Sequence, residues 1–163
     1  MVAGKIMARV SAGIVLWKKT AQGVKVFLVH PGGPFWTGKD EASWDFPKGE
    51  PDNGEEELVL TAIRELKEET GIDISSKSKE EFISLGSLKR KDGKEIYLWA
   101  VEGDWTGLLI CKSWVKMQKK DKSWISFPEV DRGDFFTIEK ARKKVFSSLL
   151  PFIDRLEEKI KQE

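Results

Sequence analysis

The segment that most restricts the fold is an acidic stretch in the first half of the chain, GEPDNGEEELVLTAIRELKEETGI, from Gly49 to Ile72. Its apolar residues recur every three or four positions, as they do on one face of an α-helix, and Gly71 is a typical stop signal. We therefore predict a helix from about Glu56 to Thr70. The apolar positions that define it are Leu58, Val59, Ala62, Ile63 and Leu66.

Apolar and β-branched runs on both sides of this helix are typical of strands. RVSAGIVLWKK and GVKVFLVHPGGPFW predict paired strands at Val10–Trp17 and Val24–His30. The Asp-Gly turn in KDGK predicts a hairpin between EFISLGSLKR and KEIYLWAVEG, and LLICKSWVKMQ and KSWISFPEV are expected to continue the β-structure. HPGGPFWTGKDEAS is rich in Gly and Pro, which predicts an ordered loop or a flexible lip beside a site.

The tail from Thr137 has apolar residues three or four positions apart and predicts a terminal helix interrupted around Pro151. Strands, a helix, further strands and a helix, in that order, favour an α+β fold or a layered α/β/α domain. The length of 163 residues fits a single domain, residues 1–163, with a substantial core.

Charge and composition argue against several classes of protein. The chain has 28 basic and 27 acidic residues, and this balance argues against duplex nucleic acid or an anionic membrane as a partner. The single cysteine, Cys111, excludes an intramolecular disulfide, and with His30 as the one histidine a Cys/His zinc site is not expected. The amino terminus lacks the layout of a signal peptide, and its apolar stretch is too short to span a bilayer. We therefore expect a cytoplasmic protein.

The predicted helix carries a cluster of carboxylates near its end. RELKEETG places Glu65, Glu68 and Glu69 at positions i, i+3 and i+4, where they lie within one turn and can converge on one cation. Carboxylates so close repel one another, and a divalent ion such as Mg²⁺, which prefers oxygen ligands and shares them with substrate phosphates, removes that repulsion. The alternative is a solvated helix face, which most charge runs are, with Arg64 and Glu68 forming a surface pair.

The residues around this cluster resemble the signature of the Nudix hydrolases. That signature is a Gly, five residues, Glu, seven residues, Arg-Glu, an aliphatic residue, any residue, Glu-Glu, any residue, Gly and an aliphatic residue. The chain has Gly49, six residues, Glu56, seven residues, and then Arg64 to Ile72. With Glu55 as the first glutamate, the first gap becomes five and the second eight. We expect the extra residue in the loop EPDNGE, because an insertion inside the helix would rotate Glu56 by about 100°.

The resemblance extends from about Ser11 to Leu156. WDFPKG is similar to the passage from strand to loop in the dinucleoside-polyphosphate and diphosphoinositol members, and FPEVDRGDFFTIEKARKKVFSSLLPFIDRL is similar to predicted NTP pyrophosphohydrolases. It implies an α/β/α sandwich with a mixed β-sheet. It also implies a hydrolase dependent on Mg²⁺ or Mn²⁺ that cleaves a pyrophosphate linkage of an NTP or a dinucleoside polyphosphate by attack of water at phosphorus.

The resemblance also implies roles for the motif residues. Glu68 and Glu69 bind the metal, and Glu65 either binds it or acts as the general base. The carbonyl of Gly49 completes the metal site, and Arg64 orients the carboxylates rather than contacting the substrate.

Further candidates lie outside the motif. Glu129 stands before the last strand, where dinucleoside-polyphosphate hydrolases have another carboxylate, although it could equally be a solvated loop residue. Lys48 is expected to contact phosphate as a point charge, the alternative being a cover for the sheet edge. Trp44 is a candidate for stacking on a base, as are Trp36 and Tyr97, and core packing is the alternative for each.

Other functions stay open. Hydrolysis of a diphosphoinositol or of capped RNA is favoured by PKG, and the lack of a strong basic patch opposes a highly phosphorylated inositol as the substrate. A catalytically silent Nudix-fold module that binds a nucleotide as a sensor is opposed by the presence of Glu65, Glu68 and Glu69. An unrelated α+β binding protein with an acidic helix is the third alternative. The substrate, the preferred base and the oligomeric state do not follow from the sequence.

Overall fold

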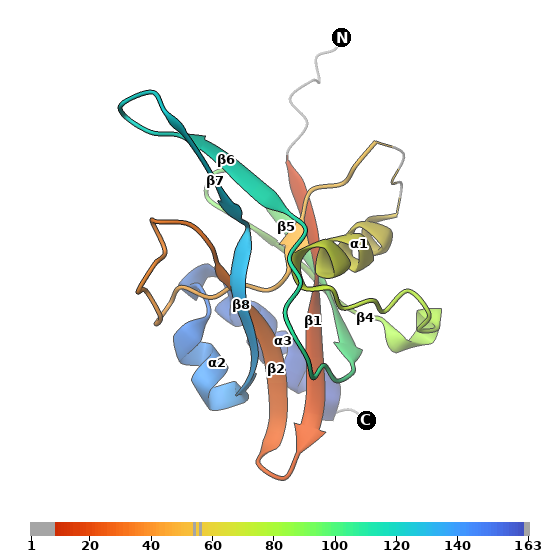
Figure 1. The fold of residues 1–163 in the computed structure, drawn as a ribbon. Coiled ribbons are helices and arrows are strands. Elements are labelled where there is room, and N and C mark those ends of the chain that lie inside the picture. The colour runs from red at the N-terminus through yellow and green to blue at the C-terminus, as the bar shows by residue number, and fades with distance from the viewer. Residues whose placement is uncertain (1–8, 54, 56, 162–163) are drawn as a thin grey trace.

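A mixed β-sheet lies between helices on its two faces in the computed structural model, which describes residues 9–53, 55 and 57–161 (Figure 1). The six strands of this sheet are β1 (Val10–Thr20), β2 (Gly23–Pro31), β3 (Lys48–Gly49), β4 (Ile83–Lys89), β5 (Glu95–Glu102) and β8 (Val130–Thr137). Their order is β4-β5-β1-β2-β8, and β3 pairs with β1 off this path. β1 is parallel to β5 and antiparallel to β2, so the predicted mixed sheet is confirmed.

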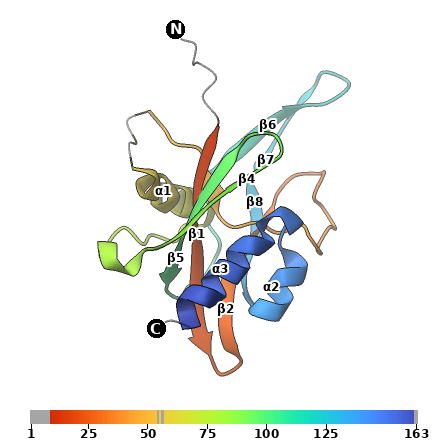
Figure 2. The ribbon, with the colours of Figure 1, turned by 180° about the vertical axis from the view of Figure 1, so that it is seen from behind.

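Helices cover both faces of this sheet. α1 (Leu58–Thr70) lies on one face, and α2 (Ile138–Lys144) and α3 (Leu150–Lys161) lie on the other (Figure 1, Figure 2). Two short 3-10 helices, Lys79–Glu81 and Ser147–Leu149, lie in the connections. The predicted α/β/α layering is therefore confirmed. In the described part of the chain, no helix has the length and apolar character needed to cross a membrane.

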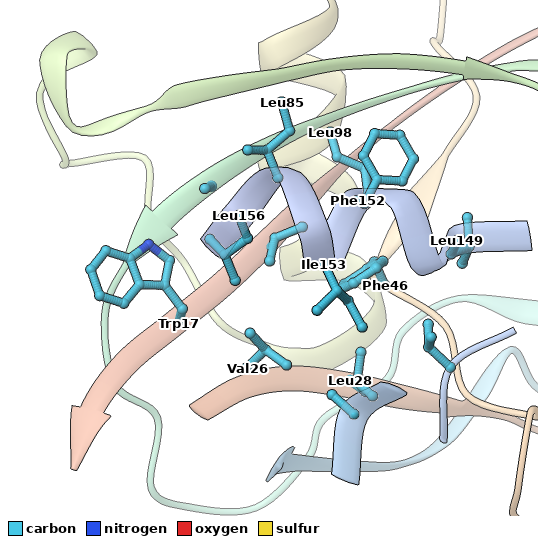
Figure 3. Close-up of a cluster of buried hydrophobic side chains, with 14 of the residues drawn as sticks. Trp17, Val26, Leu28, Phe46, Leu85, Leu98, Leu149, Phe152, Ile153 and Leu156 are labelled. Atoms are coloured by element: carbon cyan, nitrogen blue, oxygen red, sulfur yellow. The ribbon is translucent and has the colours of Figure 1, made fainter. Parts of the chain in front are cut away.

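The sequence of β1 explains why this strand lies at the centre. Its side chains alternate between the faces of the sheet. Ala12 and Ile14 pack in the core under α1, whereas Val15 and Trp17 pack in the core under α3. Figure 3 shows the second of these cores, in which Phe152 and other residues of α3 lie over β1 and β2. A strand that is apolar on both faces must be shielded from water on both, and the helices packed on each face of the sheet do this.

Both predicted hairpins of the main sheet are present. The first is longer than predicted, since β1 continues to Thr20 and β2 begins at Gly23. The second turns at Gly93, which has a φ of +91°, and the Arg90 N–H donates to the Lys94 carbonyl at 2.7 Å. A left-handed φ is what an Asp-Gly turn requires of its glycine.

The remaining β-structure differs from the prediction. β6 (Trp114–Gln118) and β7 (Trp124–Pro128) form a separate two-stranded sheet that projects from the molecule (Figure 1). Residues 108–113, which were predicted to be β-structure, form no strand. Their backbone bonds to the end of α1 instead, because the Ile110 N–H donates to the Thr70 carbonyl and the Lys112 N–H to the Glu68 carbonyl. The last carbonyls of a helix have no partner within it and accept such donors.

The helix boundaries are close to those predicted. α1 begins at Leu58 and ends as predicted, with Gly71 at a φ of +86°. Glu56, the predicted start, lies outside the described residues. The interruption predicted around Pro151 is present, since α2 ends at Lys144 and α3 begins at Leu150, with Pro151 in its first turn. Proline is tolerated there because the first N–H groups of a helix have no partner within it.

Candidate metal centre and adjoining cleft

Two carboxylates of α1 and a third from a distant part of the chain converge beside the carboxyl-terminal half of this helix. Glu65, Glu69 and Glu129 each have an oxygen that lies within 4.8 Å of one in both of the others. Glu65 and Glu69 are only 8% and 3% exposed. Their spacing of four residues sets both on the helix face that packs toward the sheet, and Glu129 reaches them from the turn between β7 and β8. We call these three residues the carboxylate triad.

Burial and mutual repulsion alter the acidity of the triad. Burial raises the pKa of Glu65 to about 7, with Arg64 opposing this rise and Glu68 and Glu129 adding to it. Burial, then Glu129 and Glu65, raise the pKa of Glu69 well above its ordinary value. Buried carboxylates that face one another are held either by protons or by a cation. This donor set consists of oxygen atoms alone, and it therefore fits a hard divalent ion such as Mg²⁺ or Mn²⁺.

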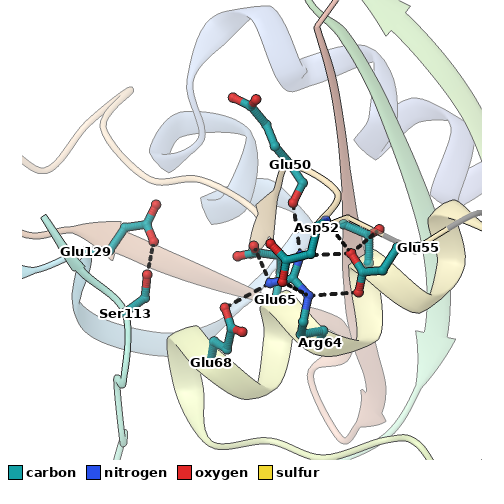
Figure 4. A network of polar contacts seen from close by, with 9 residues as sticks. Glu50, Asp52, Glu55, Arg64, Glu65, Glu68, Ser113 and Glu129 are labelled. Carbon is teal, nitrogen blue, oxygen red and sulfur yellow. Dashed lines mark hydrogen bonds and ion pairs between the residues drawn. The ribbon is translucent and has the colours of Figure 1, made fainter.

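Arg64 connects the triad to the loop before α1 (Figure 4). Its Nε donates to Glu55 Oε2 at 2.8 Å, and its Nη1 donates to Glu65 Oε1 and Glu68 Oε2, both at 3.0 Å. Its Nη2 also donates to the Glu50 carbonyl at 2.9 Å. These partners occupy the guanidinium, which fits the predicted role of orienting carboxylates.

Glu55 is the loop glutamate that pairs with Arg64 among the described residues. It also accepts hydrogen bonds from the Thr61 hydroxyl at 2.9 Å and from the Asp52 N–H at 2.8 Å. The hydrogen bond from Arg64 lowers the pKa of Glu55 to about 2, against a smaller opposing effect of burial. The pairing of Glu55 with Arg64 fits the alternative with five residues after Gly49 and eight before Arg64, and the place of the extra residue stays a prediction. Glu56, the other candidate for the first motif glutamate, lies outside the described residues.

Gly49 makes room for one carboxylate of the triad. It lies on β3, where it pairs with Ala12 of β1. A Cβ atom at Gly49 would lie 2.1 Å from Glu65 Cδ and within 2.4 Å of both carboxylate oxygens. Only a residue without a side chain allows Glu65 to approach the sheet so closely. That the Gly49 carbonyl binds metal stays a prediction.

Glu68 lies apart from the triad although it belongs to the same turn of α1. Its carboxylate bonds to Arg64, and its side chain is 41% exposed. Among the described residues, Glu129 rather than Glu68 is the third member of the converging group. The role of Glu68 as a metal ligand stays a prediction.

Glu129 is fixed in place by its neighbours. Its Oε2 accepts a hydrogen bond from the Ser113 hydroxyl at 2.5 Å, and its N–H donates to the Ser113 carbonyl at 2.8 Å. Its carbonyl accepts from the Gly32 N–H at 2.9 Å. Sequence reasoning named Glu129 but missed Ser113, because no pattern distinguishes a serine that contacts a residue on the far side of a hairpin.

A cleft adjoins the triad. One cavity of about 250 Å³ is lined by Glu69, Glu129, Lys48 and Trp36, and a second of about 420 Å³ shares Lys48 and Trp36 with it. Lys48 Nζ donates to Asp45 Oδ2 at 2.8 Å. Burial works to lower the pKa of Lys48, but Asp45 and Glu69 outweigh it and raise this pKa, so the amine stays charged. The cleft therefore has a positive charge next to the carboxylates.

Trp44 does not fit its predicted contact with the substrate. It is 3% exposed and packs edge-on against His30 and Phe136, while its Nε1 donates to Asp40. It lines a cavity of about 680 Å³ that contains none of the triad, so cavity size alone does not locate the site. Core packing, the stated alternative, describes Trp44. Trp36 lines both cavities of the cleft instead.

Comparison with known proteins identifies the family. The model of the NUDIX domain matches residues 7–156. The chain belongs to the Nudix family. A comparison with curated proteins found no match.

Solved structures of Nudix proteins have the same fold. An Ap4A hydrolase of C. elegans, in a binary complex, aligns with a TM-score of 0.67 and 19% identity over 95% of this chain and 99% of that chain. The NUDIX domain of Shewanella oneidensis NrtR complexed with ADP ribose aligns with a TM-score of 0.66 and 16% identity over 94% and 89%. These identities show the fold alone, and they confirm the predicted Nudix architecture.

One further similar structure bears on the expectation that duplex nucleic acid is not a partner. NrtR of Shewanella oneidensis complexed with a 27mer DNA aligns with a TM-score of 0.59 and 16% identity, over 94% of this chain and 62% of that one. A protein with a Nudix fold can thus bind DNA. The expectation that duplex nucleic acid is no partner has no support from the comparisons.

Proposed function

We propose that the protein hydrolyses a pyrophosphate linkage in a nucleotide, either an NTP or a dinucleoside polyphosphate, with Mg²⁺ or Mn²⁺ as cofactor. The observation that carries this proposal is the convergence of Glu65, Glu69 and Glu129 beside a cleft that contains Lys48. Membership of the Nudix family supports it. An Ap4A hydrolase and an ADP-ribose complex among the similar structures support a nucleotide as the substrate class.

A divalent ion bound at the triad would supply charge neutralisation of the phosphates and activation of the attacking water. Arg64 holds Glu65 at its place in the triad, and Ser113 holds Glu129. Glu65, whose pKa burial raises to about 7 in the metal-free protein, is the candidate general base among these residues. The identity of the base nevertheless depends on which of the carboxylates bind metal.

The cleft supplies the groups that would bind the rest of the substrate. Lys48 offers a point charge to a phosphate. Trp36 and Phe146, whose ring centroids lie 5.2 Å apart, line both cavities and offer an aromatic wall to a base. The phosphates would thus lie between the triad and Lys48, with the nucleoside farther along the cleft.

A substrate screen read by mass tests the proposal. NTPs, dinucleoside polyphosphates, ADP-ribose and a diphosphoinositol are incubated with the protein and Mg²⁺ or Mn²⁺. We expect metal-dependent release of a mononucleotide from a nucleotide substrate. Glu69→Gln should lower turnover at least about a thousandfold while the fold stays intact. Glu158→Gln, at an exposed position on α3, is the matched control and should be fully active.

The outcomes separate the alternatives. Release of phosphate from the diphosphoinositol, with no product from the other substrates, would favour the alternative function of diphosphoinositol hydrolysis. Binding of a nucleotide that requires metal, with no product from any substrate, would instead identify a nucleotide sensor. The complex of the NrtR NUDIX domain with ADP ribose is the observation that supports a nucleotide sensor as the second candidate function.

A further inference from the structure

The β6–β7 hairpin presents two tryptophans on one face. Side chains alternate along a strand, so Trp114, Lys116 and Gln118 of β6 share a face. Trp124 is the cross-strand partner of Gln118 and therefore lies on that face too. Trp114 is 61% exposed and Trp124 is 65% exposed. We call this surface the tryptophan face.

The opposite face of the hairpin contacts the rest of the molecule near its base. It carries Val115, Ile125 and Phe127, which are half-buried. The Phe127 ring packs against Gly33, where an added Cβ would lie 2.4 Å from it. Smaller apolar residues thus anchor the hairpin, while its two largest aromatic side chains are left in water. Burial within this chain does not account for the tryptophans.

Positive charge surrounds the tryptophan face. Residues 112–128 contain five lysines and one aspartate, whereas the whole chain has a net charge of only +1. In the described part of the chain, none of these lysines forms an ion pair. The five are exposed and are Lys112, Lys116, Lys119, Lys120 and Lys122. Their charge is therefore available to a polyanion.

We propose that the tryptophan face binds single-stranded nucleic acid. Trp114 and Gln118, the position opposite Trp124, are four positions apart on the strand, a distance of about 14 Å, and Lys116 lies midway. Unpaired bases can stack on the two rings while the phosphates between them contact the lysine, which is how sequence-tolerant single-strand binding works. A duplex keeps its base faces stacked and would leave the tryptophans without partners.

The position of the hairpin connects this surface to the cleft. β6 follows directly after Ser113, and β7 is followed directly by Glu129, a member of the triad. A strand bound along the hairpin would therefore run toward the metal centre. The inference goes beyond the proposed function, because a small nucleotide does not need the hairpin and binding to it does not need hydrolysis.

Fluorescence anisotropy tests the inference on the full chain. Labelled RNA and DNA strands of about ten nucleotides are titrated at low salt with a chelator present, which keeps hydrolysis out of the measurement. We expect both strands to bind, with an affinity that falls as salt rises. Trp114→Leu with Trp124→Leu should weaken binding about tenfold for each tryptophan, whereas Phe at both positions should retain most of it. An abasic strand, which keeps the phosphates, should bind as weakly to wild type as an intact strand does to the Leu variant.

Charge variants provide the matched control. Lys116→Glu with Lys120→Glu should weaken binding, and Lys159→Glu with Lys161→Glu, which makes the same change of charge at exposed positions on α3, should not. Circular dichroism and unchanged nucleotide hydrolysis would show that the Leu variant is folded.

Three results would overturn the inference. These are no binding of single strands by wild type, equal affinity in wild type and the Leu variant, or tighter binding of a duplex than of a single strand. Self-association that the Leu substitutions abolish, with no strand bound, would show instead that the face pairs with a second copy of the chain.

Discussion

Gly49 and Glu65 illustrate how single residues shape the carboxylate triad, the proposed metal site. The motif predicts both residues. Only the structure shows that the Glu65 carboxylate occupies the space where a side chain at position 49 would lie. The i and i+4 spacing likewise predicts that Glu65 and Glu69 lie on one face of α1. It cannot predict that Glu129 meets them, since that contact depends on how the β7–β8 turn packs against the helix.

Gly49→Ala is expected to displace the Glu65 carboxylate from the triad. The added methyl would lie within 2.4 Å of three carboxylate atoms, so either the side chain or β3 must shift. We expect metal affinity to fall at least about tenfold and the free energy of unfolding to fall by about 1–3 kcal/mol. Calorimetric titration with Mn²⁺ and denaturant unfolding measure the two effects. Gly103→Ala, whose nearest contact would be the end of a leucine side chain at 3.1 Å, is the milder control.

Which of Trp44 and Trp36 is buried could not be predicted from the sequence. Both lie in the Gly- and Pro-rich region between β2 and α1, and sequence offered no basis for separating them. The structure buries Trp44 because its backbone bridges to Val145, which brings its ring under α2. A contact between residues 101 positions apart leaves no local pattern.

At the scale of elements, the strongest periodic patterns were predicted best. The end of α1 and the β4–β5 turn follow from glycines that adopt a left-handed φ. The separate β6–β7 sheet does not follow from sequence, because its apolar runs look like those of the main sheet. What directs residues 108–113 away from strand pairing is the set of free carbonyls at the end of α1, which is a tertiary effect.

Ser113→Ala tests whether the hairpin positions the third carboxylate. The substitution removes the hydroxyl that donates to Glu129 Oε2 at 2.5 Å, at the point where β6 begins. We expect a loss of about 10- to 100-fold in metal affinity, as is common when a partner of a metal ligand is removed, with little change in stability. The metal dependence of turnover measures this, and Ser113→Thr should restore it. If the metal dependence of turnover in the Ala variant equals that of wild type, Glu129 does not need the hydrogen bond from the Ser113 hydroxyl.

At the scale of the whole molecule, the layers bring α1 and the β7–β8 turn together on one side of the sheet. Similar Nudix structures share only 16% to 19% identity with this chain over nearly its whole length. Apolar patterning and the motif are therefore sufficient to recognise the architecture, whereas the triad is a property of the assembled layers.

The metal-free protein is expected to lose stability as pH rises from about 4.5 to about 7. The pKa of Glu65 is raised from 4.5 to about 7 on folding, so across this window the folded chain holds a proton that the unfolded chain has released. The loss is on the order of 3 kcal/mol and is complete above pH 7. Glu69 acts in the same direction. Bound metal should reverse the loss, because it replaces the protons.

Thermal unfolding at pH 5 and pH 8, with a chelator or with Mn²⁺, measures this effect. Glu65→Gln should show a smaller difference between the two pH values than wild type does. A metal-free wild type that gains stability toward pH 8 by as much as the Gln variant would contradict the expectation.

The proposed function requires that Glu65, Glu69 and Glu129 hold a divalent metal ion. A crystal grown with Mn²⁺ tests it most directly, because the anomalous scattering of manganese locates the ion independently of the protein atoms. We predict an anomalous peak bonded to carboxylate oxygens of all three glutamates, and its loss in Glu69→Gln. A peak held by Glu68 without Glu129, or no peak at saturating Mn²⁺, would contradict the account.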